Sequence, residues 1–123
     1  MQVSKKNVNK QIEKRIFKVL YQVLADLRKP EGVKNFLDDV LSKTERTVLA
    51  KRLGIAWYLN KNKSYDVIRH DLKVSSATIA TVQGWLDKGG EGLMSAIKAI
   101  EADEWAGEMA EKVKKSFNNL LKK

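Results

Sequence analysis

Small and hydroxylated side chains crowd one short stretch of this chain, at the predicted start of a helix. The stretch contains Ser75, Ser76, Ala77, Thr78, Ala80 and Thr81. Such residues let a helix N-terminus approach a surface closely, and the helix dipole favours an anion there. Their hydroxyl groups can also form hydrogen bonds with the edges of bases. The chemistry that this stretch suits is contact with the major groove of DNA.

Residues for other kinds of chemistry are scarce. The chain has no cysteine and one histidine, His70. Disulfides, thiolate metal sites and cysteine nucleophiles are therefore excluded, and a histidine metal cluster within one chain is not expected. We predict no catalytic residue, no metal site and no cofactor, and we expect that the protein is not an enzyme.

The hydroxyl-rich stretch belongs to a segment, residues 64–88, with the spacing of a helix-turn-helix. Two helices are predicted, Tyr65–Leu72 and Ser76 to about Asp87, with a turn at residues 73–75 between them. Apolar residues at helical steps would lock the two helices together: Ile68, Leu72, Val74, Ile79, Val82 and Leu86. An ordinary helical hairpin is the alternative, because Lys73 stands where the motif usually has a glycine.

The elements before this segment are predicted to be helical as well. A basic helix over residues 10–28 ends ahead of Pro30, the one proline of the chain. A short helix follows over Glu31–Leu41. The pattern Ser-x-x-Glu from Ser42 to Glu45 is a capping box, which predicts another helix reaching about Leu59.

The elements after the segment complete an all-α fold. We predict a loop over residues 88–92, followed by one or two closing helices over residues 93–100 and 103–121. The whole chain then divides into three regions. They are a basic N-terminal helix for dimerisation or as a DNA arm (1–30), a core with the helix-turn-helix (31–88) and a C-terminal helical extension (89–123).

The charge balance is strongly basic. Lys and Arg number 24 against 15 Asp and Glu, for a formal charge of +9, and residues 1–34 hold nine of the bases against three acids. A basic protein attracts polyanions such as nucleic acid, although a well-solvated surface would account for the charge equally well. No apolar run approaches the roughly 20 residues of a membrane helix. We expect a cytoplasmic protein without a membrane partner.

Two of these features, in this order and spacing, resemble the Trp repressor family. Its members have a helix of the pattern Leu-Thr/Ser-x-x-Glu-Arg-x-x-Leu-x-x-Arg, followed by a helix-turn-helix ending in Ala-Thr-Ile-x-Arg. The residues that match here are Leu41, Ser42, Glu45, Arg46, Leu49, Arg52, Ala77, Thr78 and Ile79. The similarity covers about residues 36–86. It extends to the Trp-repressor-like proteins, which form a branch of the family.

The resemblance implies a bacterial transcriptional repressor that reads a palindromic operator. Such proteins are intertwined all-helical homodimers, in which two recognition helices enter successive major grooves of double-stranded DNA. Carried over by position, the residues that would face DNA are Arg69, Ser75, Ser76, Ala77, Thr78, Ala80 and Thr81. Arg69 projects from the first helix of the motif, which suits a phosphate contact.

The ligand-sensing positions depart from the family. Tryptophan-sensing members hold their ligand with two arginines. One is present here as Arg52, and the other falls at Thr81. Val82 replaces a glycine that leaves room for the ligand, and Trp85 replaces a small serine. By family position the candidate ligand-binding residues are Ser42, Arg52, Thr81 and Trp85. Loss of one charge-assisted contact costs about 1.5–3 kcal/mol, so L-tryptophan is not expected to be the corepressor.

The predicted function is therefore sequence-specific, dimeric DNA binding for transcriptional repression, and we do not expect control by L-tryptophan. Two rival hypotheses remain open at this stage. In one, the chain is a helical oligomerisation or interaction module. In the other, it binds nucleic acid without sequence preference, led by the basic N-terminal helix.

Overall fold

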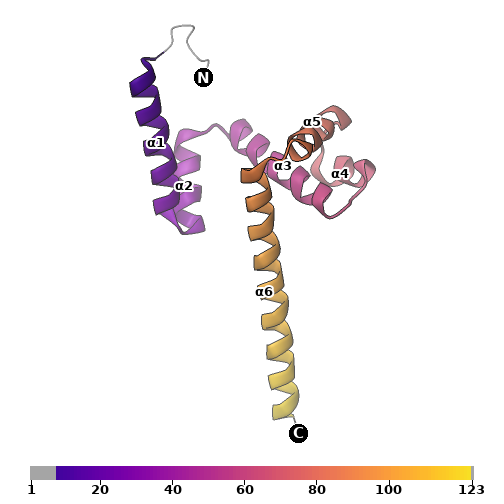
Figure 1. Ribbon diagram of the computed structural model, residues 1–123. Helices are drawn as coiled ribbons and strands as arrows, with labels where there is room; N and C mark the ends of the chain where they lie inside the picture. The colour runs from indigo at the N-terminus through magenta and orange to yellow at the C-terminus, as the bar shows by residue number, and fades with distance from the viewer. Residues whose placement is uncertain (1–7, 123) are drawn as a thin grey trace. The chain divides into compact units, whose positions relative to one another are not determined.

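The computed structural model describes residues 8–122, and in that range helices joined by short turns and loops make up the chain, with no strand (Figure 1). Six helices follow one another: α1 (Lys10–Leu27), α2 (Pro30–Val40), α3 (Lys43–Asn60), α4 (Tyr65–Leu72), α5 (Ser76–Asp87) and α6 (Glu91–Leu121). The predicted all-α class is confirmed. Residues 1–7 and 123, which belong to the predicted N-terminal and C-terminal regions, lie outside the described residues.

Two compact units divide the chain after Arg46, within α3. The first unit contains α1 and α2, which lie side by side as a helical hairpin (Figure 1). Pro30 is the first residue of α2, where the missing amide of proline costs no helical hydrogen bond. Pro30 therefore begins α2 and also prevents α1 from continuing into it.

The first unit has no core of its own. None of the described residues of α1 or α2 is fully buried. The apolar stripe of α1 stays open, with Ile12, Ile16 and Val19 each more than half exposed. The side chains that the hairpin partly shelters are Val23, Leu27, Val33, Phe36 and Leu37. A pair of helices that buries so little apolar surface requires further packing to be stable.

The predicted capping box opens α3. The Glu45 amide donates to the Ser42 hydroxyl oxygen at 3.1 Å, and the Ser42 amide donates to the Glu45 carboxylate at 2.8 Å. The bond from the Ser42 backbone amide, followed by the one from its side chain, lowers the pKa of Glu45. A carboxyl group whose pKa is lower in the folded chain stabilises the fold at neutral pH, and the contribution is lost as the pH falls through the folded value.

The second unit is built on a small core to which all four of its helices contribute. Its fully buried residues are Ile55, Ala56, Ile68, Ile79, Val82 and Ile97, from α3, α4, α5 and α6. Gly54 lets α4 approach α3, because a Cβ atom at this position would lie 3.3 Å from Leu72 Cδ1. The close packing of α3, α4 and α5 sets the geometry of the helix-turn-helix.

The loop before the last helix is shorter than predicted. A single helix, α6, stands where one or two closing helices were predicted. Glu91 and Gly92 were predicted in a loop but form the first turn of α6, which then continues unbroken to Leu121. An acidic residue in the first turn favours a helix start. Gly90 makes the tight entry possible, since a Cβ atom there would lie 3.0 Å from the Trp85 carbonyl oxygen.

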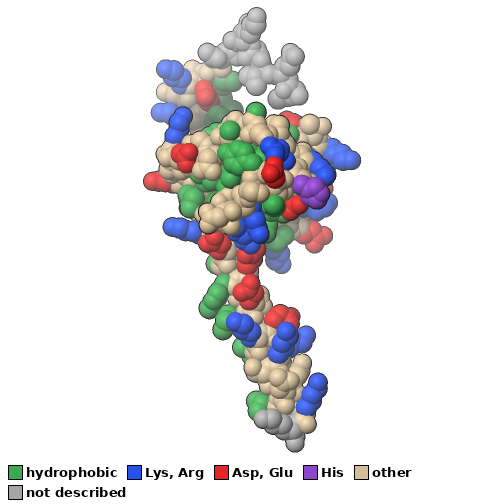
Figure 2. All heavy atoms as spheres, turned by 90° about the vertical axis from the view of Figure 1, so that its right-hand side faces the viewer, with side chains coloured by type: hydrophobic (Ala, Val, Ile, Leu, Met, Phe, Trp, Pro, Cys, Tyr) green, Lys and Arg blue, Asp and Glu red, His purple; other side chains and the backbone are tan. Residues whose placement is uncertain are grey.

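The two ends of α6 differ in their surroundings. Its N-terminal part packs on the core through Ile97, and its next turns are tied to the end of α3. Asn60 donates to Glu101 at 2.5 Å, and Lys61 pairs with Glu104 at 3.2 Å. Beyond Glu104 every described residue is exposed, and hydrophobic side chains follow one edge of the helix (Figure 2).

We expect Ser42→Ala to lower the free energy of unfolding by about 1 kcal/mol, because the variant loses the hydroxyl that accepts from the Glu45 amide. Urea unfolding followed by circular dichroism measures the change. Lys43→Ala leaves both capping bonds in place and is the matched control, expected within about 0.5 kcal/mol of the parent chain. Equal losses in the two variants would contradict a capping role for Ser42.

Candidate nucleic-acid interface

The first helix of the motif, α4, is fixed at its start by a serine cap. The Val67 amide donates to the Ser64 hydroxyl oxygen at 3.2 Å, and Ile68 turns fully into the core. At its other end, Tyr58 of α3 donates through its hydroxyl to the Asp71 carboxylate at 3.1 Å. Hydrogen bonds from His70, and then from Tyr58, lower the pKa of Asp71. The Tyr58–Asp71 hydrogen bond and the packing of Ile68 in the core together anchor α4 to α3.

The turn between the two helices adopts the conformation for which glycine is usually selected. Lys73 has φ 54° and ψ 55°, a left-handed conformation, and its amide donates to the Arg69 carbonyl at 3.0 Å. The Lys51 ammonium of α3 donates to the Lys73 carbonyl at 3.2 Å. The motif geometry therefore forms without a glycine, at the energetic cost that a Cβ atom adds in this region.

The hydroxyl-rich front of α5 is largely occupied with its own helix. Ser75 is the N-cap, and its hydroxyl accepts from the Thr78 amide at 3.2 Å and lies 3.0 Å from the Thr78 hydroxyl. The Thr81 hydroxyl donates to the Ala77 carbonyl at 3.0 Å. On the opposite side, Ile79 and Val82 are fully buried. The outward surface of α5 thus combines small side chains with hydroxyl groups that are bonded to their own helix.

Arg69 bridges the two helices of the motif. Its guanidinium contacts the Ser76 hydroxyl of α5 and the Asp66 carboxylate one turn earlier in α4. The Arg69 side chain remains 43% exposed. Two guanidinium nitrogens are engaged, and an arginine carries five N–H donors in all, so donors remain for an outside anion.

The structure places the predicted DNA-facing residues on one continuous part of the second unit. Six of them, Arg69, Ser75, Ala77, Thr78, Ala80 and Thr81, are exposed. Ser76 is half-buried beneath Arg69. Sequence reasoning did not select Asp66, although its spacing of three from Arg69 is the usual signal for an ion pair on a helix.

The predicted ligand-binding residues fall into two groups. Arg52 and Trp85 come together, with the Arg52 guanidinium carbon 5.8 Å from the centroid of the Trp85 ring. Thr81 lies one helical turn before Trp85 on α5, and its hydroxyl is used by the Ala77 carbonyl. Ser42 belongs to the first unit, where it caps α3.

The described part of the chain has neither a metal-binding cluster nor a membrane-spanning helix. Residues 8–122 contain no cluster of three or more His, Asp or Glu side chains that could hold a metal ion. Across the same residues, the helices lack a stretch both long and apolar enough to span a bilayer.

Residues 15–101 match the Trp repressor protein family, and the chain belongs to this family. A relative is the uncharacterized protein YerC of Bacillus subtilis (strain 168), which is 28% identical over 85 residues. The matched part covers 69% of this chain and 82% of YerC. No solved structure matches the chain. The family is one of DNA-binding regulators, so membership indicates a DNA-binding regulatory role for this chain.

Lys73→Gly should raise the free energy of unfolding by up to about 1 kcal/mol, because glycine adopts the left-handed conformation without a steric cost. Lys73→Ala keeps a Cβ atom and should give no such gain. Thermal and urea unfolding of both variants provide the comparison. A glycine variant less stable than the alanine variant would show that the turn is not strained at Lys73.

Proposed function

We propose that the protein is a transcriptional repressor that binds a palindromic operator as a homodimer, with α5 in the major groove of double-stranded DNA. The observation that carries the proposal is the outward face of α5. It presents Ala77, Thr78, Ala80 and Thr81 to solvent above a fully buried back, and Arg69 lies beside its first turn. Small side chains on a fixed helix allow close approach to the groove floor.

The residues of this face divide by the contact that their chemistry suits. Arg69 carries spare donors next to the N-terminus of α5, which is the arrangement for a backbone phosphate. Ala77 and Ala80 can contact the methyl group of thymine, and Thr78 can bond a base edge. Ser76 supports Arg69, so we assign it a positioning role together with any base contact.

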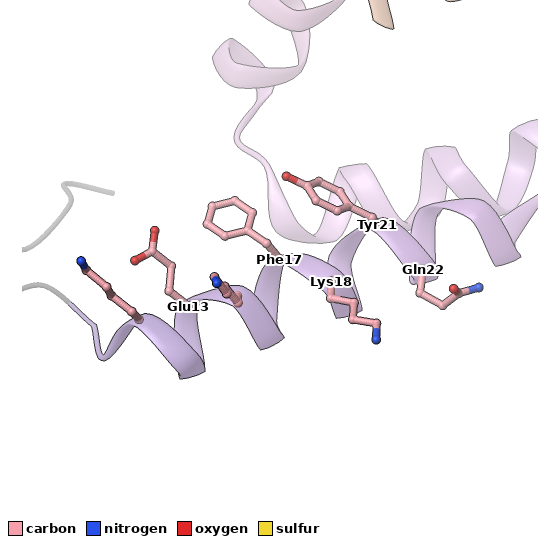
Figure 3. Close-up of a pocket in the computed structure, with 7 residues that line it drawn as sticks. Glu13, Phe17, Lys18, Tyr21 and Gln22 are labelled. Carbon is pink, nitrogen blue, oxygen red and sulfur yellow. The ribbon is translucent and has the colours of Figure 1, made fainter.

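The homodimer is supported by the apolar surface that one chain leaves open. The first unit has no fully buried residue in α1 or α2. Figure 3 shows Phe17 and Tyr21 standing along one side of α1, and their ring centroids lie 6.0 Å apart. The open surface that they share with Glu13, Lys18 and Gln22 belongs to α1 alone. A second copy is the partner that would cover it.

A dimer also accounts for the apolar residues exposed on α3. Val48, Leu49 and Leu53 are 39%, 50% and 38% exposed, although the same helix carries the fully buried Ile55 and Ala56. In such a dimer, the two helix-turn-helix motifs would be related by a two-fold axis. They would meet half-sites about 34 Å apart, one turn of the double helix.

Because the proposed target is DNA, we expect the protein to act in the cytoplasm.

We further propose that L-tryptophan does not control this repressor. The Arg52 guanidinium, the one ligand-holding arginine that the family resemblance leaves in place, already lies over the Trp85 indole. A free indole would compete with a side chain that belongs to the same fold. Isothermal calorimetry should detect no micromolar binding of L-tryptophan, and heat from such binding would overturn this part of the proposal.

Titration of labelled duplex DNA by fluorescence anisotropy tests DNA binding itself. Affinity should fall about a thousandfold between 50 and 200 mM salt if six phosphates are contacted. Selection of bound duplexes from a random pool should enrich one palindromic sequence. Salt-dependent binding without enrichment would identify a nonspecific binder, and no binding at low salt would identify an interaction module.

Arg69→Ala should weaken binding to every duplex and reduce the slope of log affinity against log salt by about 1, since one phosphate contact is lost. Asp66→Asn should act in the opposite direction, because it removes the carboxylate that competes for the Arg69 guanidinium. Ala80→Ser should instead change which duplex is preferred. Lys98→Ala, at an exposed position in the N-terminal part of α6, is the control for the loss of a positive charge elsewhere.

A further inference from the structure

The C-terminal part of α6 carries a surface that the proposed DNA contact does not use. Residues 102–121 lie beyond the stretch that matches the family. They continue α6 without a break, and past Glu104 none of the described side chains is sheltered. The helix nevertheless has large apolar residues at steps of three and four: Trp105, Met109, Val113, Phe117, Leu120 and Leu121.

These residues form one continuous apolar face, which we call the α6 stripe. At 100° per residue, they and the alanines between them fall within less than half of the helix circumference. Their exposed fractions run from 39% for Met109 to 70% for Leu121. Figure 2 shows hydrophobic side chains along one edge of this helix. An apolar stripe of this length on an otherwise polar helix is the mark of a helix that packs on a partner.

The charges of the same segment indicate which partner. Residues 101–111 contain five acids and no base: Glu101, Asp103, Glu104, Glu108 and Glu111. Residues 112–122 contain four bases and no acid: Lys112, Lys114, Lys115 and Lys122. The helix is thus negative toward the core and positive toward its end. A second helix with the same sequence complements it only when it runs the opposite way.

We propose that residues 102–121 of α6 pair in antiparallel orientation with the same segment of a second copy of this chain. The α6 stripes then face each other, and the acidic half of each helix lies beside the lysine half of its partner. A parallel pair would set acid against acid and lysine against lysine, which is unfavourable at the short distances between packed helices. Helices that lie on anionic membranes carry lysine and arginine along their polar face, whereas half of this one is acidic.

The register follows from the position of the charge boundary. An antiparallel pair centred between Glu111 and Lys112 places residue 106 of one chain opposite residue 117 of the other. Two copies of residue 106 are then separated along the helix axis by about 16 Å, at 1.5 Å per residue. In a parallel pair the same two residues would lie side by side. Disulfide formation therefore distinguishes the two orientations.

The absence of natural cysteine makes this test direct. Full-length Ala106→Cys and Phe117→Cys chains, one carrying a mass tag, are co-expressed and then oxidised. We expect the mixed 106–117 disulfide to exceed both self-linked products by at least tenfold. Self-linked products in excess would show parallel pairing and overturn the proposal. Absence of any linked dimer would overturn it too, and binding of the parent chain to phosphatidylglycerol vesicles would then identify a lipid surface as the occupant.

Charge reversal gives an independent test that leaves the apolar stripe intact. Glu108→Lys/Glu111→Lys makes the helix largely basic, and Lys112→Glu/Lys115→Glu makes it largely acidic. Each double variant, placed in the cysteine background, should lose at least tenfold of the 106–117 product. An equimolar mixture of the two should recover it. Linking that is unchanged by either variant would show that the charges do not select the partner. Circular dichroism checks that the helix is retained in each variant.

DNA binding is measured on the same variants. Since the α6 stripe lies outside the helix-turn-helix, failure of the disulfide test would leave the proposed operator binding standing. Loss of duplex binding with intact disulfide linking would overturn the proposed operator binding and leave the α6 pairing standing.

Discussion

The second unit depends on the burial of a few branched side chains. Ile55, Ile68, Ile79, Val82 and Ile97 are fully buried and come from four helices. Branching at the Cβ atom restricts each of them to few rotamers. A core of this kind therefore holds its helices in a defined relation. The orientation of α5 follows directly, because Ile79 and Val82 hold one side of it inward and leave the other side to solvent.

Polar contacts then refine what the core has positioned. Ser64 and Ser75 satisfy the amides at the starts of α4 and α5. Arg69 links the two helices through Ser76 and is itself partly neutralised by Asp66. The positive charge available to DNA is consequently set by an acid within the motif as well as by the arginine. The Ser75 and Thr81 hydroxyl groups, which the sequence offers for base contact, form hydrogen bonds with the backbone of their own helix.

The two units differ in how far a single chain can complete them. The second unit closes its own core, whereas α1 and α2 bury no side chain fully. The C-terminal half of α6 shares this property with the first unit, since its apolar residues are exposed. Both ends of the chain thus carry apolar helices that a partner would complete. A small reading module held between two association surfaces fits the operator binding that we propose.

Local sequence patterns were sufficient to predict where most of the helices lie along the chain. Apolar steps of three and four, the Ser42–Glu45 capping box and Pro30 located five helices to within a residue or two at their ends. These signals act between near neighbours, so they can be read without the fold. The same reading placed Glu91 and Gly92 in a loop, because glycine is an ambiguous signal that either breaks a helix or allows a tight entry to one. The family resemblance, which rests on Ser42–Arg52 and Ala77–Ile79, also came from the sequence and is confirmed.

Contacts between distant residues were decided only by the tertiary structure. Lys73 occupies a left-handed turn that its residue type disfavours, because the packing of α4 and α5 outweighs the local cost. Arg52 and Trp85 lie 33 positions apart, and the family positions assigned both to one candidate ligand site. Only the structure shows that the Arg52 guanidinium lies over the Trp85 ring. The hydroxyl-rich stretch that pointed to DNA from the start is exposed along α5 because Ile79 and Val82 are buried beneath it. Sequence determined which side chains that face could offer, and the core determined which of them point outward.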